Sequence, residues 1–486
     1  MTATPEQGSP VEPVVEPAPE PSGPPKTAVI TPAIQAARLY AQQQVLSKSA
    51  AVQPDLLPLP DGPLPGASLA AEPMPGFFTK LEYPEGSQPL ATFEDALAEL
   101  EAGTRKEPVR LAMYGASGTA VDLWTAYLRA YLHKRFGDAG PGVIAPAPHT
   151  KWYRHHEYVV SANKLKYWTK HNSYRHKDTE TKGLFGAMGV AMSAKSKRAS
   201  VTIQPNKRSV SALVATEFEF YHLVQPGGGS YIVKVDGKKV AEVSTKAKRR
   251  KDPPKLGTHR LEVAAGEHEI RVEIKGNGEV WMLGIAAETG KPGVVVDNFG
   301  VDGARIANLK IWDKDLWQEH LRLRDPVLYT LHFGTNSAVD EDESMTKYEK
   351  DYRLALDQFR EAVPKASCVV LGPSDYPKVD GEIVTPRPRI GEIRELQRKL
   401  AVEYGCAFWD MLKFVGGEGA QAAWVKAELT RKDYLHLTRN GYVRWGIGLT
   451  DALMYNYDLA RLDSNEPAPA ATTTTTDVAE HAQPNP

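Results

Sequence analysis

This chain has few cysteines, no long hydrophobic run and no marked excess of charge of either sign. Cys368 and Cys406 are its two cysteines. They cannot build a disulfide framework, and neither stands near other metal-binding residues. Both lie in apolar segments and are expected to be buried on strands, which leaves open whether they form a single bridge. No run is long enough to span a bilayer. No basic region precedes an apolar stretch at the N-terminus, so no signal peptide is recognised.

The charge balance is close to neutral. The formal net charge of −1 gives no overall attraction to nucleic acid or to a membrane, so we expect neither as a partner. Basic residues are concentrated between residues 151 and 255. Such runs are usually solvated loops, and the alternative is attraction to an anionic polymer. The two dense clusters are Lys195, Lys197 and Arg198, and Lys246, Lys248, Arg249, Arg250 and Lys251.

Proline, alanine and glutamate dominate the first 85 residues. Such a segment cannot bury enough apolar surface to fold, so residues 1–85 are predicted to be a disordered leader. A short helix over Ala33–Val45 fits the local sequence, but nothing flanks it for it to pack against. Residues 463–486, which carry a threonine run, are predicted to be a disordered tail.

Between these ends the hydrophobic period changes twice. Residues 86–148 and 293–462 alternate strands with helices, which predicts a three-layer α/β/α domain with a five-stranded parallel sheet. Residues 149–292 carry short alternating segments and Gly-rich turns, the pattern of an antiparallel β-sandwich inserted into that domain. The five parallel strands are expected at Arg110–Tyr114, Val294–Phe299, Val327–Phe333, Ser367–Leu371 and Cys406–Trp409.

Two segments of the α/β part carry groups suited to nucleophilic catalysis. Tyr114–Ser117 ends a predicted strand with a hydroxyl nucleophile at Ser117. Asp433 and His436 stand three residues apart, just ahead of the closing helix. At this spacing the carboxylate can accept a hydrogen bond from one imidazole nitrogen while the other nitrogen faces a serine.

Two further segments offer hydrogen-bond donors for a developing oxyanion. Val301–Ala304 brings a backbone amide at Gly303, and Phe333–Asn336 brings a side-chain amide at Asn336. Ser117, Gly303 and Asn336 each follow a predicted strand. Because the carboxyl ends of parallel strands meet at one edge of a sheet, these groups are expected to lie together.

Each of these groups also has a plainer interpretation. Gly115–Gly118 is common as a turn or helix N-cap, and Asn336 is an ordinary turn former. Asp433 could cap a turn beside a surface histidine, and Gly303 could simply start a helix. The functional interpretation depends on all of them occurring together, in this order. A helix running from Ser117 to Gly137 would add a modest positive end beside the serine.

Taken together, the four segments resemble the SGNH (GDSL-type) hydrolases, which have a flavodoxin-like fold. The resemblance implies that Ser117 is the nucleophile and that Asp433 and His436 complete the triad. It implies an oxyanion hole of Ser117, Gly303 and Asn336, and neither a metal nor an organic cofactor. The family usually has Gly-Asp-Ser at the nucleophile. Here Ala116 replaces that aspartate, which is not the triad acid, so catalysis is still expected.

Further segments resemble a branch of bacterial envelope esterases that remove O-acetyl groups from peptidoglycan. That branch carries an inserted β-sandwich similar to a carbohydrate-binding module. Aromatic side chains of the insert could stack on sugar faces, and the alternative is that they form the sandwich core. The segments that match this branch are Arg129, Phe136–Gly142, Phe408–Asp410, Gly416–Gly417 and Trp424. The aromatic residues of the insert are Trp152, Tyr153, Tyr158, Trp168 and Tyr174, of which Trp152, Tyr153 and Trp168 are the candidates for binding sugar.

The sequence and the resemblance thus predict a carbohydrate O-acetylesterase that acts on an O-acetylated envelope glycan, with peptidoglycan as the favoured polymer. Two alternatives stay open: an O-acetyltransferase on an envelope polysaccharide, and a noncatalytic glycan-binding protein. We expect a monomer. The missing export signal favours the cytosol, whereas the resemblance implies the cell envelope or periplasm, which we favour.

Overall fold

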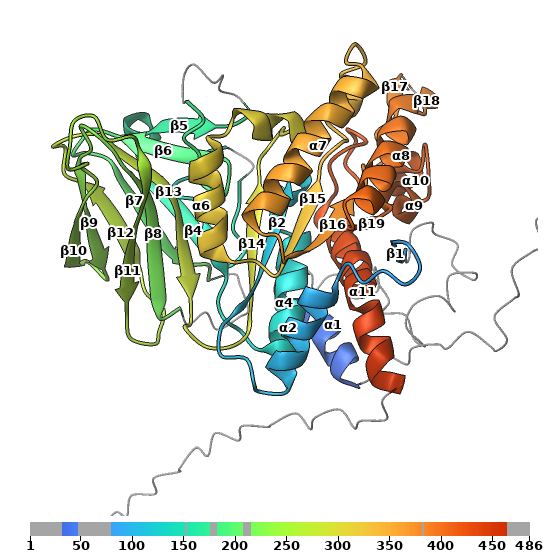
Figure 1. The fold of residues 1–486 in the computed structure, drawn as a ribbon, viewed down its shortest axis with the longest axis horizontal. Coiled ribbons are helices and arrows are strands. Elements are labelled where there is room, and N and C mark those ends of the chain that lie inside the picture. The colour runs from blue at the N-terminus through green and yellow to red at the C-terminus, as the bar shows by residue number, and fades with distance from the viewer. Residues whose placement is uncertain are drawn as a thin grey trace, which may run out of the picture.

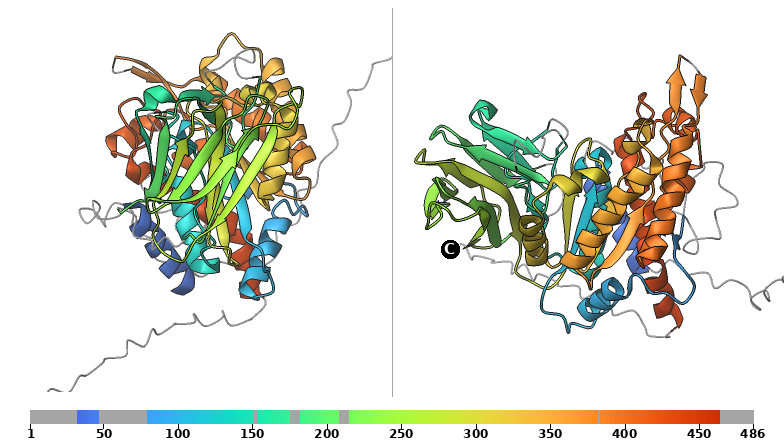
Figure 2. Two further views of the ribbon diagram at one scale, coloured as in Figure 1. Left: turned by 90° about the vertical axis from the view of Figure 1, so that its left-hand side faces the viewer. Right: turned by 45° about the horizontal axis from the view of Figure 1, so that its top comes forward.

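The structure, a computed structural model, describes residues 32–46, 79–150, 153–174, 182–207, 215–381 and 383–463. Two parts lie side by side: an antiparallel β-sandwich and an α/β domain in which helices cover a central sheet (Figures 1 and 2). The chain enters the α/β domain, leaves it to form the sandwich, and returns to complete the sheet. The mixed α/β class and the inserted sandwich agree with the prediction.

The central sheet has six strands in the order β1-β19-β16-β15-β2-β14. β1 pairs antiparallel with β19, and the other neighbours all pair in parallel. The sheet is therefore mixed, which corrects the prediction of five parallel strands. The additional strand is only two residues long and lies in the segment predicted as leader. The bounds are β1 (Leu81–Glu82), β2 (Val109–Gly115), β14 (Val294–Gly300), β15 (Leu328–His332), β16 (Ser367–Leu371) and β19 (Ala407–Trp409).

The order of the five parallel strands determines where a ligand site can form. Counted along the chain, they run 2-1-3-4-5 across the sheet, so the chain reverses direction between β2 and β15. Open α/β sheets bind ligands beyond the carboxyl ends of the strands at such a reversal. Ser117 follows β2 and Asn336 follows β15, so both lie beside it.

Helices cover both faces of this sheet, as buried parallel strands require. α6, α7 and α8 pack in succession on the face turned toward the viewer in Figure 1, and α4 packs with α11 and α1 on the other. The helices are α1 (Pro32–Leu46), α2 (Ala91–Glu101), α3 (Ser117–Ala120), α4 (Trp124–Phe136), α6 (Lys314–Arg324), α7 (Met345–Ala362), α8 (Pro388–Glu403), α9 (Met411–Val415), α10 (Gln421–Lys426) and α11 (Arg439–Asp463), with short 3-10 turns η4 (Leu165–Tyr167), η5 (Ile306–Ile311) and η6 (Ser337–Val339).

Helix α1 coincides with the short helix that the sequence allows over Ala33–Val45, and the structure supplies the packing partners that the flanking sequence lacks. The helix packs against α4 and α11, with Ile34, Ala37 and other residues of one face buried. Its buried Arg38 forms an ion pair with Asp451 of α11 at 2.5 Å. The partners of this helix lie about 90 and 400 residues further along the chain, so no flanking sequence could reveal them. Most of the remaining leader, and the tail from residue 464, lie outside the described residues.

The inserted sandwich consists of two antiparallel sheets that enclose their own apolar core. One has the order β10-β9-β12-β7-β4, and the other β11-β8-β13-β6-β5, with β3 pairing β13. Since β3 already belongs to it, the sandwich begins several residues before the predicted boundary at 149. The strands are β3 (Gly142–Ile144), β4 (Tyr158–Asn163), β5 (Thr169–Asn172), β6 (Val190–Ala194), β7 (Ser200–Pro205), β8 (Glu217–Val224), β9 (Ser230–Val235), β10 (Lys238–Ser244), β11 (Lys255–Glu262), β12 (Ile270–Ile274) and β13 (Val280–Glu288); a separate hairpin joins β17 (Lys378–Asp380) to β18 (Ile383–Thr385).

Buried ion pairs connect the sandwich to the α/β domain. Glu288, the last residue of β13, accepts hydrogen bonds from Arg324 of α6 and Arg110 of β2 at 2.6 and 2.7 Å. Arg324 also donates to Asp297 of β14 at 2.8 Å. Because buried charges are tolerated only when they are paired, the side chains of this cluster depend on one another across the junction.

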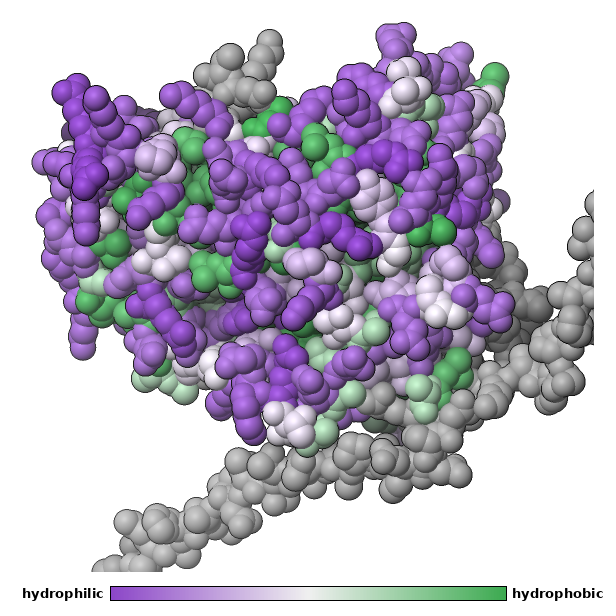
Figure 3. Space-filling view, viewed as in Figure 1, coloured by the Kyte–Doolittle hydropathy of each residue, from purple (hydrophilic) through white to green (hydrophobic). Residues whose placement is uncertain are grey.

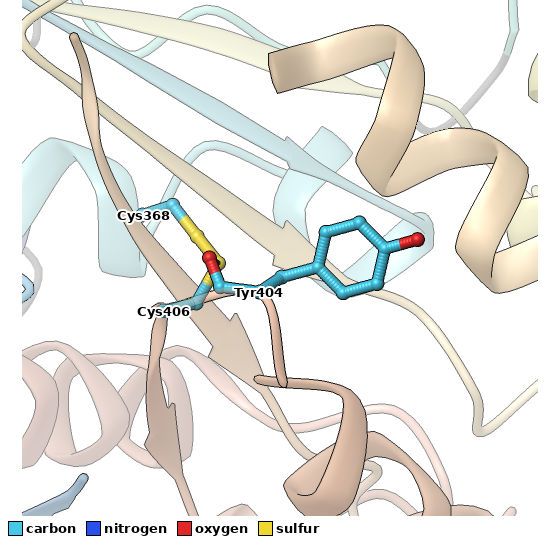
Figure 4. The surroundings of a disulfide bond; sticks show 3 residues. All are labelled: Cys368, Tyr404 and Cys406. Atoms are coloured by element: carbon cyan, nitrogen blue, oxygen red, sulfur yellow. Dashed lines mark hydrogen bonds between the residues drawn. A yellow bond between two sulfur atoms is a disulfide. The ribbon is translucent and has the colours of Figure 1, made fainter. Parts of the chain in front are cut away.

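The two cysteines form a disulfide bond. Cys368 lies on β16 and Cys406 directly precedes β19, and these two strands are neighbours in the central sheet (Figure 4). Their Cα atoms are 4.8 Å apart and both residues are buried. The bridge answers the question that the sequence left open. Disulfides persist mainly in oxidising compartments.

The face seen in Figure 3 is mostly hydrophilic, and its hydrophobic residues occur in small separate groups. Among the described helices, none is both long enough and apolar enough to cross a membrane.

Candidate active site

Ser117 stands in a tight turn at the end of β2. Gly115 has no room for a side chain, because a Cβ atom there would overlap the side chain of Thr119. Ser117 then begins α3, a helix of four residues, and the chain turns at Asp122 (φ 50°) before α4 starts. The predicted continuous helix from Ser117 to Gly137 is therefore broken. A single turn provides little of the helix dipole expected beside the serine.

His436 and Asp433 lie in a turn that faces Ser117. The Oγ atom of Ser117 is 3.2 Å from Nε2 of His436, and Nδ1 of His436 is 2.8 Å from Oδ2 of Asp433. Tyr434 adopts a left-handed conformation (φ 56°), which lets the amides of Leu435 and His436 donate back to Oδ1 of Asp433. Left-handed backbone is uncommon for such a residue and is maintained here by the turn.

The electrostatics suit a serine–histidine pair. Partial burial raises the pKa of Asp433, but the hydrogen bonds from the amide and ring of His436 outweigh it, so the pKa lies below its usual value. Asp433 is therefore ionised at neutral pH. It accepts from Nδ1 of His436, which leaves Nε2 able to accept the proton of Ser117. The side chains of His436 and Asp433 remain 34% and 49% exposed.

Asn336 lies on the wall of the same pocket as Ser117 and His436. One hydrogen of its amide group is donated to the carbonyl of Ala304 at 3.0 Å, so its second hydrogen remains for an oxyanion. That bond also connects the loop after β15 with the loop that contains Gly303. Gly303 has φ 77°, a conformation that favours glycine, but it is not on the wall of the pocket at Ser117. Its part in an oxyanion hole stays a prediction.

A pocket of about 40 Å³ opens beside Ser117. Its size suits a small acyl group, because one water needs roughly 10–15 Å³ on this measure. The predicted Ser117, Asn336 and His436 are all on its wall. Most of the remaining wall residues lie in or directly beside the predicted segments; they are Ala116, Gly118, His332, Phe333, Gly334, Thr335, Leu435 and Leu437. Four come from other segments that the sequence did not indicate, namely Ser374, Met411 of α9, and Tyr442 and Trp445 of α11.

His332 is the most notable wall residue that was not itself predicted to belong to the site. Its side chain is buried, its ring packs edge-on against Trp445 at 4.7 Å, and neither ring nitrogen has a hydrogen-bond partner among the described residues. Burial lowers the pKa of His332 to about 4, so the ring is neutral at pH 7. A sequence signal did exist, because His332 ends β15 directly before the Phe333–Asn336 segment.

The aromatic side chains predicted to bind sugar are mostly buried. Tyr153 is 7% exposed, and its hydroxyl accepts a hydrogen bond from the amide of Ala145. Trp168 is 5% exposed and belongs to the sandwich core. Buried rings present no face to a sugar, so this prediction is wrong for both residues. Trp152 lies outside the described residues.

A buried cluster of Asp122, His155 and Glu157 has the composition of a metal site. However, Arg129 forms ion pairs with both carboxylates, at 3.1 Å to Asp122 and 2.5 Å to Glu157. The guanidinium already supplies the positive charge that a cation would bring. The cluster therefore acts as an ion-pair network that holds the start of the sandwich against α4.

Comparison with known proteins agrees with this geometry. Residues 275–444 match the GDSL-like Lipase/Acylhydrolase family. The matched stretch contains Gly303, Asn336, Asp433 and His436, and Ser117 lies before it. The predicted resemblance to this family is confirmed over these residues, and the match supports an ester hydrolase of the SGNH type. A comparison with curated protein sequences gave no match.

Solved structures with a similar fold include a peptidoglycan O-acetylesterase, with a TM-score of 0.63 and 23% identity over 76% of this chain and 97% of that one. A family two carbohydrate esterase from Cellvibrio japonicus has a TM-score of 0.24 and 10% identity, over 62% of this chain and 99% of that one. An acetyl xylan esterase has a TM-score of 0.26 and 20% identity, over 34% and 82%. Of these structures, the peptidoglycan O-acetylesterase establishes a shared fold. Because its match extends over most of both chains, the shared fold includes the sandwich.

Proposed function

We propose that this protein is a serine esterase that removes O-acetyl groups from a cell-envelope carbohydrate, with peptidoglycan as the favoured substrate. The observation that carries the proposal is the aligned set Ser117, His436 and Asp433 at the carboxyl edge of the sheet, with contacts of 3.2 and 2.8 Å. The substrate class is supported by the peptidoglycan O-acetylesterase that shares the fold.

In the first half of the proposed reaction, Oγ of Ser117 attacks the acetyl carbonyl while Nε2 of His436 takes its proton. The Asn336 amide, with the backbone amides of Ser117 and Gly303, stabilises the oxyanion of the tetrahedral intermediate. His436 then gives the proton to the sugar oxygen, the C–O bond breaks, and the sugar alcohol leaves an acetyl-serine.

In the second half, water attacks the acetyl-serine. His436 takes a proton from the water, and the collapse of the second intermediate returns it to Ser117 and releases acetate. The exposure of His436 and Asp433 gives water direct access to this step. Ala116 does not interrupt the chemistry, since no part of the Ser117–His436–Asp433 alignment passes through its side chain.

An acetyl group is the acyl group that best fits the site. The narrow pocket of about 40 Å³ beside Ser117 suits a small acyl group. The envelope location is supported by the buried Cys368–Cys406 disulfide, which is typical of oxidising compartments outside the cytosol.

The test is acetate release from p-nitrophenyl acetate and from O-acetylated peptidoglycan, with the parent compared with Ser117→Ala and His436→Ala. We expect the parent to release acetate from both substrates and both variants to lose activity. Formation of newly acetylated glycan in place of free acetate would identify an acetyltransferase. A correctly folded parent that releases no acetate from either ester would contradict the proposal.

A further inference from the structure

Among the aromatic residues of the insert that the structure describes, Tyr174 differs from the buried ones because its side chain is 41% exposed. It lies just beyond the end of β5, where its backbone amide donates to Oδ1 of Asn172 at 2.9 Å. Trp168, on the other side of β5, is only 5% exposed. The turn after β5 therefore directs one aromatic ring outward.

The ring of Tyr174 lies against the α/β domain at the predicted oxyanion loop. A Cβ atom added to Gly303 would come within 2.6 Å of Cε1, 2.8 Å of Cδ1 and 3.0 Å of Cζ of this ring. The ring thus covers Gly303 closely enough to exclude any side chain there. A residue of the sandwich consequently forms part of the surroundings of the catalytic loops.

Arg305 connects Tyr174 with the segment that carries Asn336. Its guanidinium lies 5.8 Å from the centre of the Tyr174 ring and donates to the carbonyl of Gly303 at 3.4 Å. It also pairs with Asp340, which directly follows η6 and so lies four residues beyond Asn336. The aromatic ring therefore lies against Gly303, and Arg305 links it to the segment that follows Asn336.

The pocket beside Ser117 and the Tyr174 ring occupy different parts of this region. Residues from α9 and α11 line the pocket, and Tyr174 is not on its wall. An ester bound at Ser117 has an acyl part and an alcohol part. The small pocket suits the acyl part, which leaves the side toward the insert for the alcohol part.

We propose that Tyr174 is a specificity-determining residue that stacks against the sugar ring bearing the acetyl ester, an inference that rests on the proposed function. A half-exposed tyrosine offers a flat apolar face to the C–H face of a pyranose and a hydroxyl to its polar edge. Arg305 adds donors at the same rim for sugar oxygens. The insert thereby selects the alcohol part of the ester.

The experiment compares kcat/KM for O-acetylated peptidoglycan fragments with kcat/KM for p-nitrophenyl acetate, which has no sugar. For Tyr174→Ala we expect the ratio of glycan to small-ester kcat/KM to fall roughly tenfold, mainly through KM, from the loss of an aromatic contact. Tyr174→Phe keeps the ring and should retain most of the ratio. Tyr167→Ala, a change of a partly exposed tyrosine before β5, is the matched control and should leave both activities unchanged.

Each other outcome has a distinct meaning. A parent that cleaves neither ester contradicts the proposed function itself. A parent that cleaves both, with an unchanged ratio in Tyr174→Ala, overturns only the inference about Tyr174. Equal loss on both substrates would show that Tyr174 merely supports the Gly303 loop, and a parent active on the small ester alone would exclude the sugar subsite.

Discussion

The α/β domain and the sandwich insert place their chemically informative side chains in opposite ways. In the α/β domain, the polar residues Ser117, Asn336 and His436 come from segments far apart in sequence and meet at one edge of the sheet. In the insert, aromatic residues such as Trp168 turn inward and form the core. Parallel strands bring their carboxyl ends together, so a position after a strand is informative. Antiparallel strands alternate faces, so the residue type alone does not show which way it points.

The largest effect that this comparison predicts is in the α/β domain. Ser117→Ala should lower kcat/KM for p-nitrophenyl acetate by roughly 10⁴-fold or more, because the nucleophile is lost. Ser374→Ala is a matched control: its hydroxyl also lies on the pocket wall but accepts a hydrogen bond from Gln421. Ser374→Ala should lower kcat/KM far less than Ser117→Ala does. Steady-state kinetics of the two purified variants decide the matter, and full activity in Ser117→Ala would remove Ser117 from the mechanism.

The corresponding change in the insert should affect stability and leave the chemistry intact. Trp168→Ala should lower the free energy of unfolding by roughly 3–5 kcal/mol, because it removes a buried aromatic side chain from the core. Activity per folded molecule toward p-nitrophenyl acetate should not change, and Trp168→Phe should recover part of the stability. Denaturant unfolding and kinetics are the measurements. A stable Trp168→Ala variant that loses glycan affinity would restore Trp168 as a binding residue.

Asn336 of the α/β domain and Asn277 of the insert allow the two parts to be compared with the same residue type. Asn336→Ala should lower kcat by roughly 10²–10³-fold with little change in KM, as expected when one oxyanion donor is removed. Asn277 of the insert accepts a hydrogen bond from the Ser230 amide at 2.8 Å, so Asn277→Ala should lower stability and leave kcat unchanged. Kinetics and thermal unfolding of both variants give the comparison. An unchanged kcat in Asn336→Ala would exclude it as an oxyanion donor.

The smallest predicted effect concerns the junction of the two parts. Burial raises the pKa of Glu288, but Arg324 and Arg110 outweigh this and lower it to about 2. A lowered carboxyl pKa gives stability that is present above the unfolded value near 4.5 and is lost as pH falls toward 2. Glu288→Gln should therefore cost roughly 2–3 kcal/mol at pH 7 and much less near pH 2. Denaturant unfolding across this range tests it, and a cost independent of pH would contradict the ion-pair explanation.

The α/β sheet and the site segments could be predicted because their signals are local. The strand predicted at Val294–Phe299 differs from β14 by one residue, since buried parallel strands are continuous apolar runs. The three-residue spacing of Asp433 and His436 likewise specifies a turn that brings the carboxylate to the ring.

What the sequence could not reveal depends on contacts between distant segments. Helix α1 is stabilised by α4 and α11, and the Cys368–Cys406 bridge depends on the adjacency of β16 and β19. The break after Ser117 is stabilised by Asp122, whose carboxylate pairs with Arg129 and accepts a hydrogen bond from Thr125. The exposure of Tyr174 and the burial of Trp168 follow from the packing of the insert.

The central claim is that His436 activates Ser117 as a nucleophile. It is tested most directly by treating the folded protein with a fluorophosphonate, which phosphonylates activated serines, and mapping the modified peptide by mass spectrometry. We predict one phosphonyl group on Ser117 in the parent and none in His436→Ala. Modification of another serine, or an unmodified Ser117 in the folded parent, would contradict the account.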